Sequence, residues 1–97
     1  MKYKIVIPSY KREKTIQVKT LNSLKEQKDI NLKNVDIFVA NKEEYDIYKN
    51  ALNPEDYGNL IIGELGIGNQ RKFIRNYYQN NTPILSLDDD VSGLEKT

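Results

Sequence analysis

Three consecutive aspartates, Asp88, Asp89 and Asp90, are the residues of this chain that point most directly to chemistry. They follow an apolar run at 83–87 that predicts a β-strand, so the chain delivers three carboxylates to the mouth of a buried sheet. In extended backbone Asp88 and Asp90 would point to one face and Asp89 to the other. Neighbouring carboxylates repel one another unless they share a cation or a proton, and their oxygens suit Mg²⁺ or Mn²⁺. We therefore expect Asp88 and Asp90 to hold Mn²⁺ or Mg²⁺; the alternative is a solvated acidic turn.

A glycine-rich segment, Gly66-Ile67-Gly68-Asn69-Gln70-Arg71, opens a predicted helix. Glycines permit a tight turn and close backbone approach, and the N–H groups at a helix start can bind phosphate. Arg71 would balance the carboxylates or bind a diphosphate through parallel hydrogen bonds, whereas Arg75 is expected to be solvated. The segment lacks the Gly-Lys-Ser/Thr of a P-loop and the third glycine of the dinucleotide fingerprint. Gly66, Gly68 and Arg71 are therefore candidate phosphate-binding residues; the alternative is a flexible loop.

The turn after the first apolar run is the third candidate site, with the sequence Pro8-Ser9-Tyr10-Lys11-Arg12. Its hydroxyl, aromatic ring and two cations could stack on a nucleobase, hydrogen-bond it and neutralise phosphate. We expect Pro8, Ser9, Tyr10 and Arg12 to contact a ligand; the alternative is an ordinary strand-to-helix turn with solvated charges.

Composition limits the chemistry that these residues can perform. The 97 residues suffice for one domain, and 38% hydrophobic with 30% charged residues excludes a disordered chain. The net charge of +1 gives no general reason to expect nucleic acid or an anionic membrane as a partner. The absence of Cys and His excludes disulfides, thiolate or imidazole metal ligands and a histidine base. No apolar stretch has the length of a membrane span or signal-peptide core, so we expect a cytoplasmic location without membrane contact.

The elements that must position these residues alternate along the chain. This order predicts an α/β, Rossmann-like fold with a mainly parallel βαβαβαβ sheet. Ligands of such sheets bind at the carboxyl ends of the strands, which here are 8–12, 40–41, 63–68 and 88–90. Four tyrosines at helical spacing, Tyr45, Tyr48, Tyr77 and Tyr78, are expected to lie in the core with their hydroxyls at its rim. The predicted strands are 3–7, 35–40, 60–62 and 83–87, and the predicted helices are 15–27, 42–52 and 66–78.

Together the three motifs resemble the front half of GT-A glycosyltransferases, particularly the large family-2-like group. In such enzymes a Pro-Ser/Thr-Tyr/Phe-Asn/Lys-Arg turn after the first strand holds the nucleotide base, and here that turn is 8–12. A Gly-x-Gly-x-x-Arg segment and an Asp-x-Asp metal motif follow in the family, and 66–71 and 88–90 match them. The segments Gly-Asn-Gln-Arg-Lys and Asp-Asp-Asp-Val are similar to those of a phage-associated group that is proposed to glycosylate hydroxymethylated DNA bases.

The resemblance covers nearly the whole chain and implies a partial GT-A fold in residues 1–97. It implies transfer of a sugar from a nucleotide diphosphate donor, UDP-linked by expectation, to an acceptor hydroxyl, with a modified DNA base as one candidate acceptor. Asp88 and Asp90 would bind the metal, Asp88 and Arg71 would contact the donor, and Pro8–Arg12 would seat the base. The family often has an acidic residue after the second strand, where this chain has Ala40-Asn41-Lys42.

The acceptor-binding half and the general base of such enzymes lie beyond the Asp-x-Asp motif. This chain has seven residues after Asp90, so we expect it to be an isolated or truncated donor-binding half, with no evident general base. A nucleotide-sugar module that binds without turnover fits as well. A sugar nucleotidyltransferase would need a glycine-rich loop after the first strand, and a protein–protein module would need no metal. A missing half would leave one edge of the sheet uncovered, and because uncovered edges pair with other chains, we expect self-association.

Overall fold

A computed structural model of the chain describes residues 3–27, 29–78 and 81–89. Four strands form one sheet in which every paired neighbour is parallel, in the order β3-β2-β1-β4. The predicted α/β, Rossmann-like fold is therefore confirmed. Because β1 lies between β2 and β4, the strand order reverses beside β1, and ligands of such sheets bind at that point. The strands are β1 (Lys4–Pro8), β2 (Val35–Val39), β3 (Asn59–Ile62) and β4 (Ile84–Ser86).

The first helical stretch begins two residues earlier than predicted and contains a π-helical turn. It consists of α1 (Glu13–Ile16), the π-helix η1 (Gln17–Leu21) and α2 (Asn22–Lys25). It starts early because the Ile16 N–H donates to the Arg12 carbonyl, at 2.9 Å. Such π-turns inside α-helices are rare and frequently lie at functional sites, and this one carries the buried Thr20.

The two longer helices follow the predicted pattern to within one residue at each end. They are α3 (Lys42–Ala51) and α4 (Ile67–Tyr77). Asn41 caps α3, since its Oδ1 accepts a hydrogen bond from the Glu44 N–H at 2.9 Å. Gly66 precedes α4 with a φ of 95°, a conformation that side chains disfavour, so glycine is needed there. Short 3₁₀ helices precede β2 and β3, namely η2 (Leu32–Asn34) and η3 (Pro54–Asp56).

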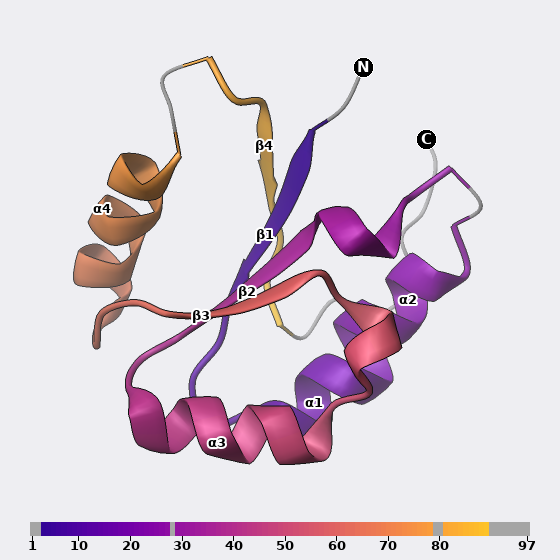
Figure 1. Cartoon of the computed structure of the whole chain (residues 1–97), viewed down its shortest axis with the longest axis horizontal. Coiled ribbons are helices and arrows are strands. Elements are labelled where there is room, and N and C mark those ends of the chain that lie inside the picture. Colours follow the sequence, from indigo (N-terminus) through magenta and orange to yellow (C-terminus); the bar gives the residue numbers. More distant parts are fainter. Residues whose placement is uncertain (1–2, 28, 79–80, 90–97) are drawn as a thin grey trace.

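One face of the sheet packs against α1, η1, α2 and α3, which Figure 1 shows gathered on one side of the strands while α4 lies apart from them. Side chains alternate along a strand, so every second residue of β1 and β2 reaches this face. The helices close over it with buried apolar side chains. The buried core comprises Ile5, Ile7, Ile16, Leu21, Leu24, Val35, Ile37, Val39, Tyr48, Leu52 and Tyr57.

The opposite face is organised by Phe38 of β2, which is fully buried. Its ring makes edge-on contacts with Phe73, Tyr77 and Tyr78 of the α4 segment, with ring centroids 5.3–6.1 Å apart. Such aromatic pairs each contribute about 0.5–1.5 kcal/mol beyond their buried area. The contacts hold α4 against the sheet.

A buried carboxylate, Asp36, stabilises the amino end of the same face. It accepts hydrogen bonds from the Tyr78 hydroxyl and from Asn59 Nδ2, and Lys4 Nζ lies 3.6 Å away. Burial raises the pKa of the Tyr78 hydroxyl well above its usual value, and the adjacent Asp36 raises it further. Tyr78 therefore remains the donor in this pair.

No helix in the described ranges is long and apolar enough to cross a membrane.

Candidate functional site

A cavity of about 510 Å³ opens at the carboxyl edge of the sheet, where all four strands end. Turns that follow the four strands contribute its walls, although they lie far apart in the sequence. The lining residues are Pro8, Ser9, Tyr10, Arg12, Ala40, Glu64, Leu65, Gly66, Ile67, Gln70, Arg71, Asp88 and Asp89.

The structure thus brings together most of the candidate residues that the sequence suggested. Pro8, Ser9, Tyr10 and Arg12 lie beside Gly66, Arg71 and Asp88 in this one cavity. Gly68 does not line it, and a side chain placed there would meet no atom within 4 Å. Asp90, the second predicted metal ligand, lies outside the described residues.

The turn after β1 is held from below by α3. Lys11 adopts the left-handed conformation, with a φ of 54°, which a residue other than glycine adopts only under constraint. Its N–H donates to Glu44 Oε1 at 2.6 Å, and the next N–H, of Arg12, donates to the Tyr48 hydroxyl at 3.0 Å. Glu44 and Tyr48 are one helical turn apart and both are buried. Two side chains of α3 therefore fix the backbone of the turn.

Tyr48 also connects the Arg12 amide to a directed chain of hydrogen bonds that leads into the cavity. Its hydroxyl lies 2.6 Å from Ser9 Oγ, and Ser9 Oγ donates to Asp89 Oδ2 at 2.7 Å. The amide of Arg12 can only donate and the carboxylate of Asp89 can only accept. Each hydrogen bond therefore has one donor: the Arg12 amide donates to Tyr48, the Tyr48 hydroxyl donates to Ser9, and the Ser9 hydroxyl donates to Asp89.

The chain closes on itself through the side chain of Arg12, whose guanidinium lies 3.6 Å from Asp89 Oδ1. Burial raises the pKa of the Tyr48 hydroxyl, and the hydrogen bond with Ser9 offsets part of this rise. Tyr48 thus keeps its proton at neutral pH and remains the donor to Ser9. The expectation that Tyr48 lies in the core is confirmed, whereas its hydroxyl does not reach the rim of the core, because Tyr48 is fully buried beneath the turn.

The two described aspartates after β4 have different roles. Asp89 is engaged by Ser9 and Arg12, as above. The backbone of Asp88 is fixed instead, since Thr20 Oγ1 of the π-turn donates to the Asp88 carbonyl at 2.6 Å. The Asp88 carboxylate is exposed and makes no hydrogen bond or ion pair with any residue that the structure describes. Of the two described aspartates, Asp88 is therefore the one whose carboxylate is open to a ligand; the carboxylate of Glu64, which also lines the cavity, is exposed as well.

Gln70 ties the glycine-rich segment to the sheet. Its Oε1 accepts from the Glu64 N–H at 3.0 Å, and its Nε2 donates to the Val39 carbonyl at 3.2 Å. The side chain fits closely, because a Cβ on Gly63 would lie 2.0 Å from Gln70 Oε1. Gln70 is buried whereas the next residue, Arg71, is exposed in the cavity. The hydrogen bonds of Gln70 therefore fix the helical backbone that carries Arg71 in the cavity.

A divalent cation would find only part of a site in the described residues. The open Asp88 carboxylate is a suitable hard oxygen ligand, but the Asp89 oxygens are occupied by Ser9 and Arg12. Over 3–27, 29–78 and 81–89, no three acidic side chains gather as a metal-binding group. A site at Asp88 thus fits a cation that keeps several waters or phosphate oxygens as ligands, as Mg²⁺ usually does.

Four residues that support the cavity were not among the sequence candidates: Thr20, Glu44, Tyr48 and Gln70. Only one signal could have suggested any of them. Glu44 lies one helical turn before Tyr48 on the face of α3 that must pack against the sheet, and a carboxylate there requires a buried partner. Thr20 and Gln70 show no such signal; the partner of Thr20 lies 68 residues away, and Gln70 bonds Val39, 31 residues away, as well as Glu64, six residues away.

The cavity therefore combines an exposed arginine, an open carboxylate, a braced turn with an aromatic ring, and a glycine-entered helix. Comparisons with protein-family models, with curated proteins and with solved structures give no match for this chain.

Proposed function

We propose that the chain is the donor-binding portion of a cytoplasmic, metal-dependent glycosyltransferase of the GT-A type, using a nucleotide diphosphate sugar with UDP as its nucleotide. The observation that carries the proposal is the meeting of the 8–12 turn, Arg71 and Asp88 in one cavity at the reversal of strand order. The motif resemblance supplies the ligand class, and the cavity gives each motif a place to act together with the others.

Each part of the cavity has a role in this proposal. Tyr10, exposed at the mouth, stacks on the base, and the braced 8–12 backbone presents its polar groups to the base and ribose. Arg71 binds the diphosphate, because guanidinium matches phosphate oxygens with parallel hydrogen bonds. Asp88, with Asp90, holds Mn²⁺ or Mg²⁺, which supplies stabilisation of negative charge on the leaving diphosphate. The acceptor remains open, and a hydroxyl of a modified DNA base is one candidate.

The test is calorimetric titration of UDP into the wild type and variants, each with and without Mn²⁺. Wild type should bind UDP more tightly with Mn²⁺, and Arg71→Ala should weaken binding about 10- to 100-fold, since a hydrogen bond to a charged group contributes about 1.5–3 kcal/mol. Asp88→Asn should remove most of the Mn²⁺ dependence. Both residues are exposed, so the free energy of unfolding should change by less than about 0.5 kcal/mol.

Asp46→Asn is the matched control, because Asp46 is an exposed carboxylate on α3 that pairs with Lys42 and lines no part of the cavity. It should leave UDP affinity and the Mn²⁺ response unchanged. Failure of the wild type to bind UDP both with and without Mn²⁺, or equal effects of Asp46→Asn and Asp88→Asn, would refute the proposal.

The second candidate is a module that binds the nucleotide sugar without turnover. It is favoured by the state of Asp89, whose carboxylate oxygens face Ser9 and Arg12 and so are poorly placed to take a proton from an acceptor. Release of free sugar or transfer to hydroxymethylated DNA from a UDP-sugar would exclude this alternative. Tight, Mn²⁺-dependent UDP binding without either reaction would support it.

A further inference from the structure

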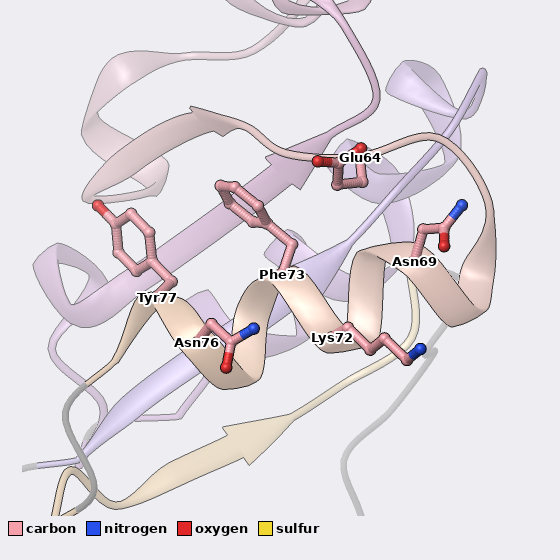
Figure 2. A pocket seen from close by; sticks show the side chains of 6 residues that line it. All are labelled: Glu64, Asn69, Lys72, Phe73, Asn76 and Tyr77. Atoms are coloured by element: carbon pink, nitrogen blue, oxygen red, sulfur yellow. The ribbon is translucent and has the colours of Figure 1, made fainter.

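A second cavity of about 460 Å³ lies between α4 and the segment that follows β3, and its lining chemistry is unused by the proposed donor site. Figure 2 shows Phe73 and Tyr77 rising from α4 toward β3, with three polar side chains along the helix and Glu64 on the facing segment. The polar side chains are those of Asn69, Lys72 and Asn76.

The second cavity occupies a different side of α4 from the first. Its helical residues are spaced at i, i+3, i+4, i+7 and i+8 from Asn69, so they share one face. Arg71 and Gln70, which line the first cavity, fall outside this spacing. Glu64 lines both cavities, which makes it their common wall.

The lining offers hydrogen-bonding groups around an aromatic surface. Tyr77 is 49% exposed although it is a large aromatic residue, and its inner edge rests on Phe38. Asn69 Nδ2 donates to the Leu65 carbonyl at 3.1 Å, and its Oδ1 makes no hydrogen bond to any described residue. The side chains of Lys72 and Asn76 make no hydrogen bond or ion pair within the described part of the chain. The cavity therefore has both hydrogen-bond donors and hydrogen-bond acceptors beside the ring of Tyr77.

We propose that this cavity binds a neutral, hydroxyl-rich ring of the carbohydrate type. A sugar ring has an apolar face that packs on an aromatic side chain, and hydroxyls at its edge that both donate and accept hydrogen bonds. The volume lies within the range of about 300–1,000 Å³ that is usual for small-ligand sites.

The charges of the lining favour a neutral ligand over a polyanion. The cavity has one cation, Lys72, and one carboxylate, Glu64, so a phosphate chain would gain no net attraction there. A purely apolar ligand is equally disfavoured, because it would leave Asn69 Oδ1 and the side-chain amide of Asn76 without hydrogen-bonding partners. The proposed sugar site does not require a bound donor, although it shares Glu64 with the proposed nucleotide cavity.

The experiment is NMR titration of the isotope-labelled chain with the neutral disaccharides maltose, lactose and cellobiose at millimolar concentration. At least one of them should shift the side-chain amide signals of Asn69 and Asn76 and the ring signals of Tyr77. Asn76→Ala should weaken that sugar about tenfold, as expected for loss of a side chain that orients the ligand. Because Tyr77 contacts Phe38, Tyr77→Ala is compared with Tyr77→Phe, which keeps the ring and should retain most of the affinity.

Arg75→Ala is the matched control, since Arg75 is exposed on the same helix and lines neither cavity. It should leave sugar binding unchanged. The proposal is overturned if none of the sugars shifts these signals, if the shifts map to Arg71 and Asp88 instead, or if a thymidine octanucleotide binds this face while the sugars do not. UDP titration of the same samples separates the two proposals, because Arg71 and Asp88 line only the first cavity whereas Asn76 and Tyr77 line only the second.

Discussion

Replacing Tyr48 with phenylalanine removes one oxygen atom from beneath the candidate site while keeping the ring that fills the core. The hydroxyl accepts from the Arg12 N–H at 3.0 Å and lies 2.6 Å from Ser9 Oγ. In the variant the Arg12 N–H loses its acceptor and Ser9 loses its donor. A typical hydrogen bond contributes about 1 kcal/mol net, and leaving a buried partner unsatisfied costs about 1–3 kcal/mol. We therefore expect a loss of about 2 kcal/mol in the free energy of unfolding.

Urea unfolding followed by circular dichroism measures this loss directly. In a domain of this size, about 2 kcal/mol should lower Tm by roughly 8–16 °C. The matched control is Tyr45→Phe on the same helix, where the ring contacts Lys42 and Lys49 and the hydroxyl makes no hydrogen bond to any described residue. That variant should stay within about 0.5 kcal/mol of wild type.

The same substitution should loosen the turn that the proposed donor contacts. UDP affinity should therefore fall about threefold to tenfold in Tyr48→Phe and remain unchanged in Tyr45→Phe. If both variants lose equal stability, or if Tyr48→Phe loses less than about 0.5 kcal/mol, the hydrogen-bond circuit does not brace the site and the reasoning fails.

Three further predictions address other parts of the fold. Gly63→Ala should cost about 1–2 kcal/mol in urea unfolding, because the new Cβ would lie 2.0 Å from Gln70 Oε1 and displace it from its backbone partners; a neutral result would contradict the role given to Gln70. Gly68→Ala should stabilise α4 by about 0.4–1 kcal/mol, since no atom other than the adjacent residues and the nearby backbone of the same helix lies within 4 Å of the added Cβ, and a lower Tm would count against this. Burial and the hydrogen bond to Asp36 raise the pKa of Tyr78 above 10.0, so its contribution to stability is complete below pH 10 and is lost as the pH rises toward the higher folded value. Through Tyr78 alone the unfolding free energy should then fall by about 1.4 kcal/mol per pH unit above about pH 11, in addition to the falls due to Tyr48 and Tyr57, whose pKa values are also raised. Tyr78→Phe should reduce this slope, and an unchanged slope would exclude Tyr78 as one of its sources.

The candidate residues could be identified from sequence because each motif is local. Pro8 to Arg12 follows a β-rich run, Gly66 permits the turn into a helix, and Asp88 follows an apolar strand. Hydrophobic periodicity over a few residues predicts the strands, the helices and their alternation. A parallel sheet then places the carboxyl ends of all its strands at one edge. The motifs could thus be assigned to one edge without knowledge of any side-chain contact.

The roles of individual side chains could not be predicted in this way. The triple aspartate suggested a symmetrical pair at Asp88 and Asp90, yet Asp89 is the carboxylate tied to Ser9, across 80 residues of sequence. Tyr48 read as an ordinary core residue, and its hydroxyl instead begins the hydrogen-bond circuit. Gly68 belongs to the glycine motif but lies outside the cavity.

The sequence by itself determined the kind of chemistry available to this protein. Without Cys or His, a site must be built from carboxylates, arginine, tyrosine, hydroxyls and backbone amides, and the order of elements places them at the sheet edge. The tertiary structure decided which of these groups are engaged and which are open. Hydrogen bonds such as those of Asp89 and Thr20 depend on distances and angles set by the packing of α1, η1 and α3 on the sheet, and periodicity along the chain carries no record of that geometry.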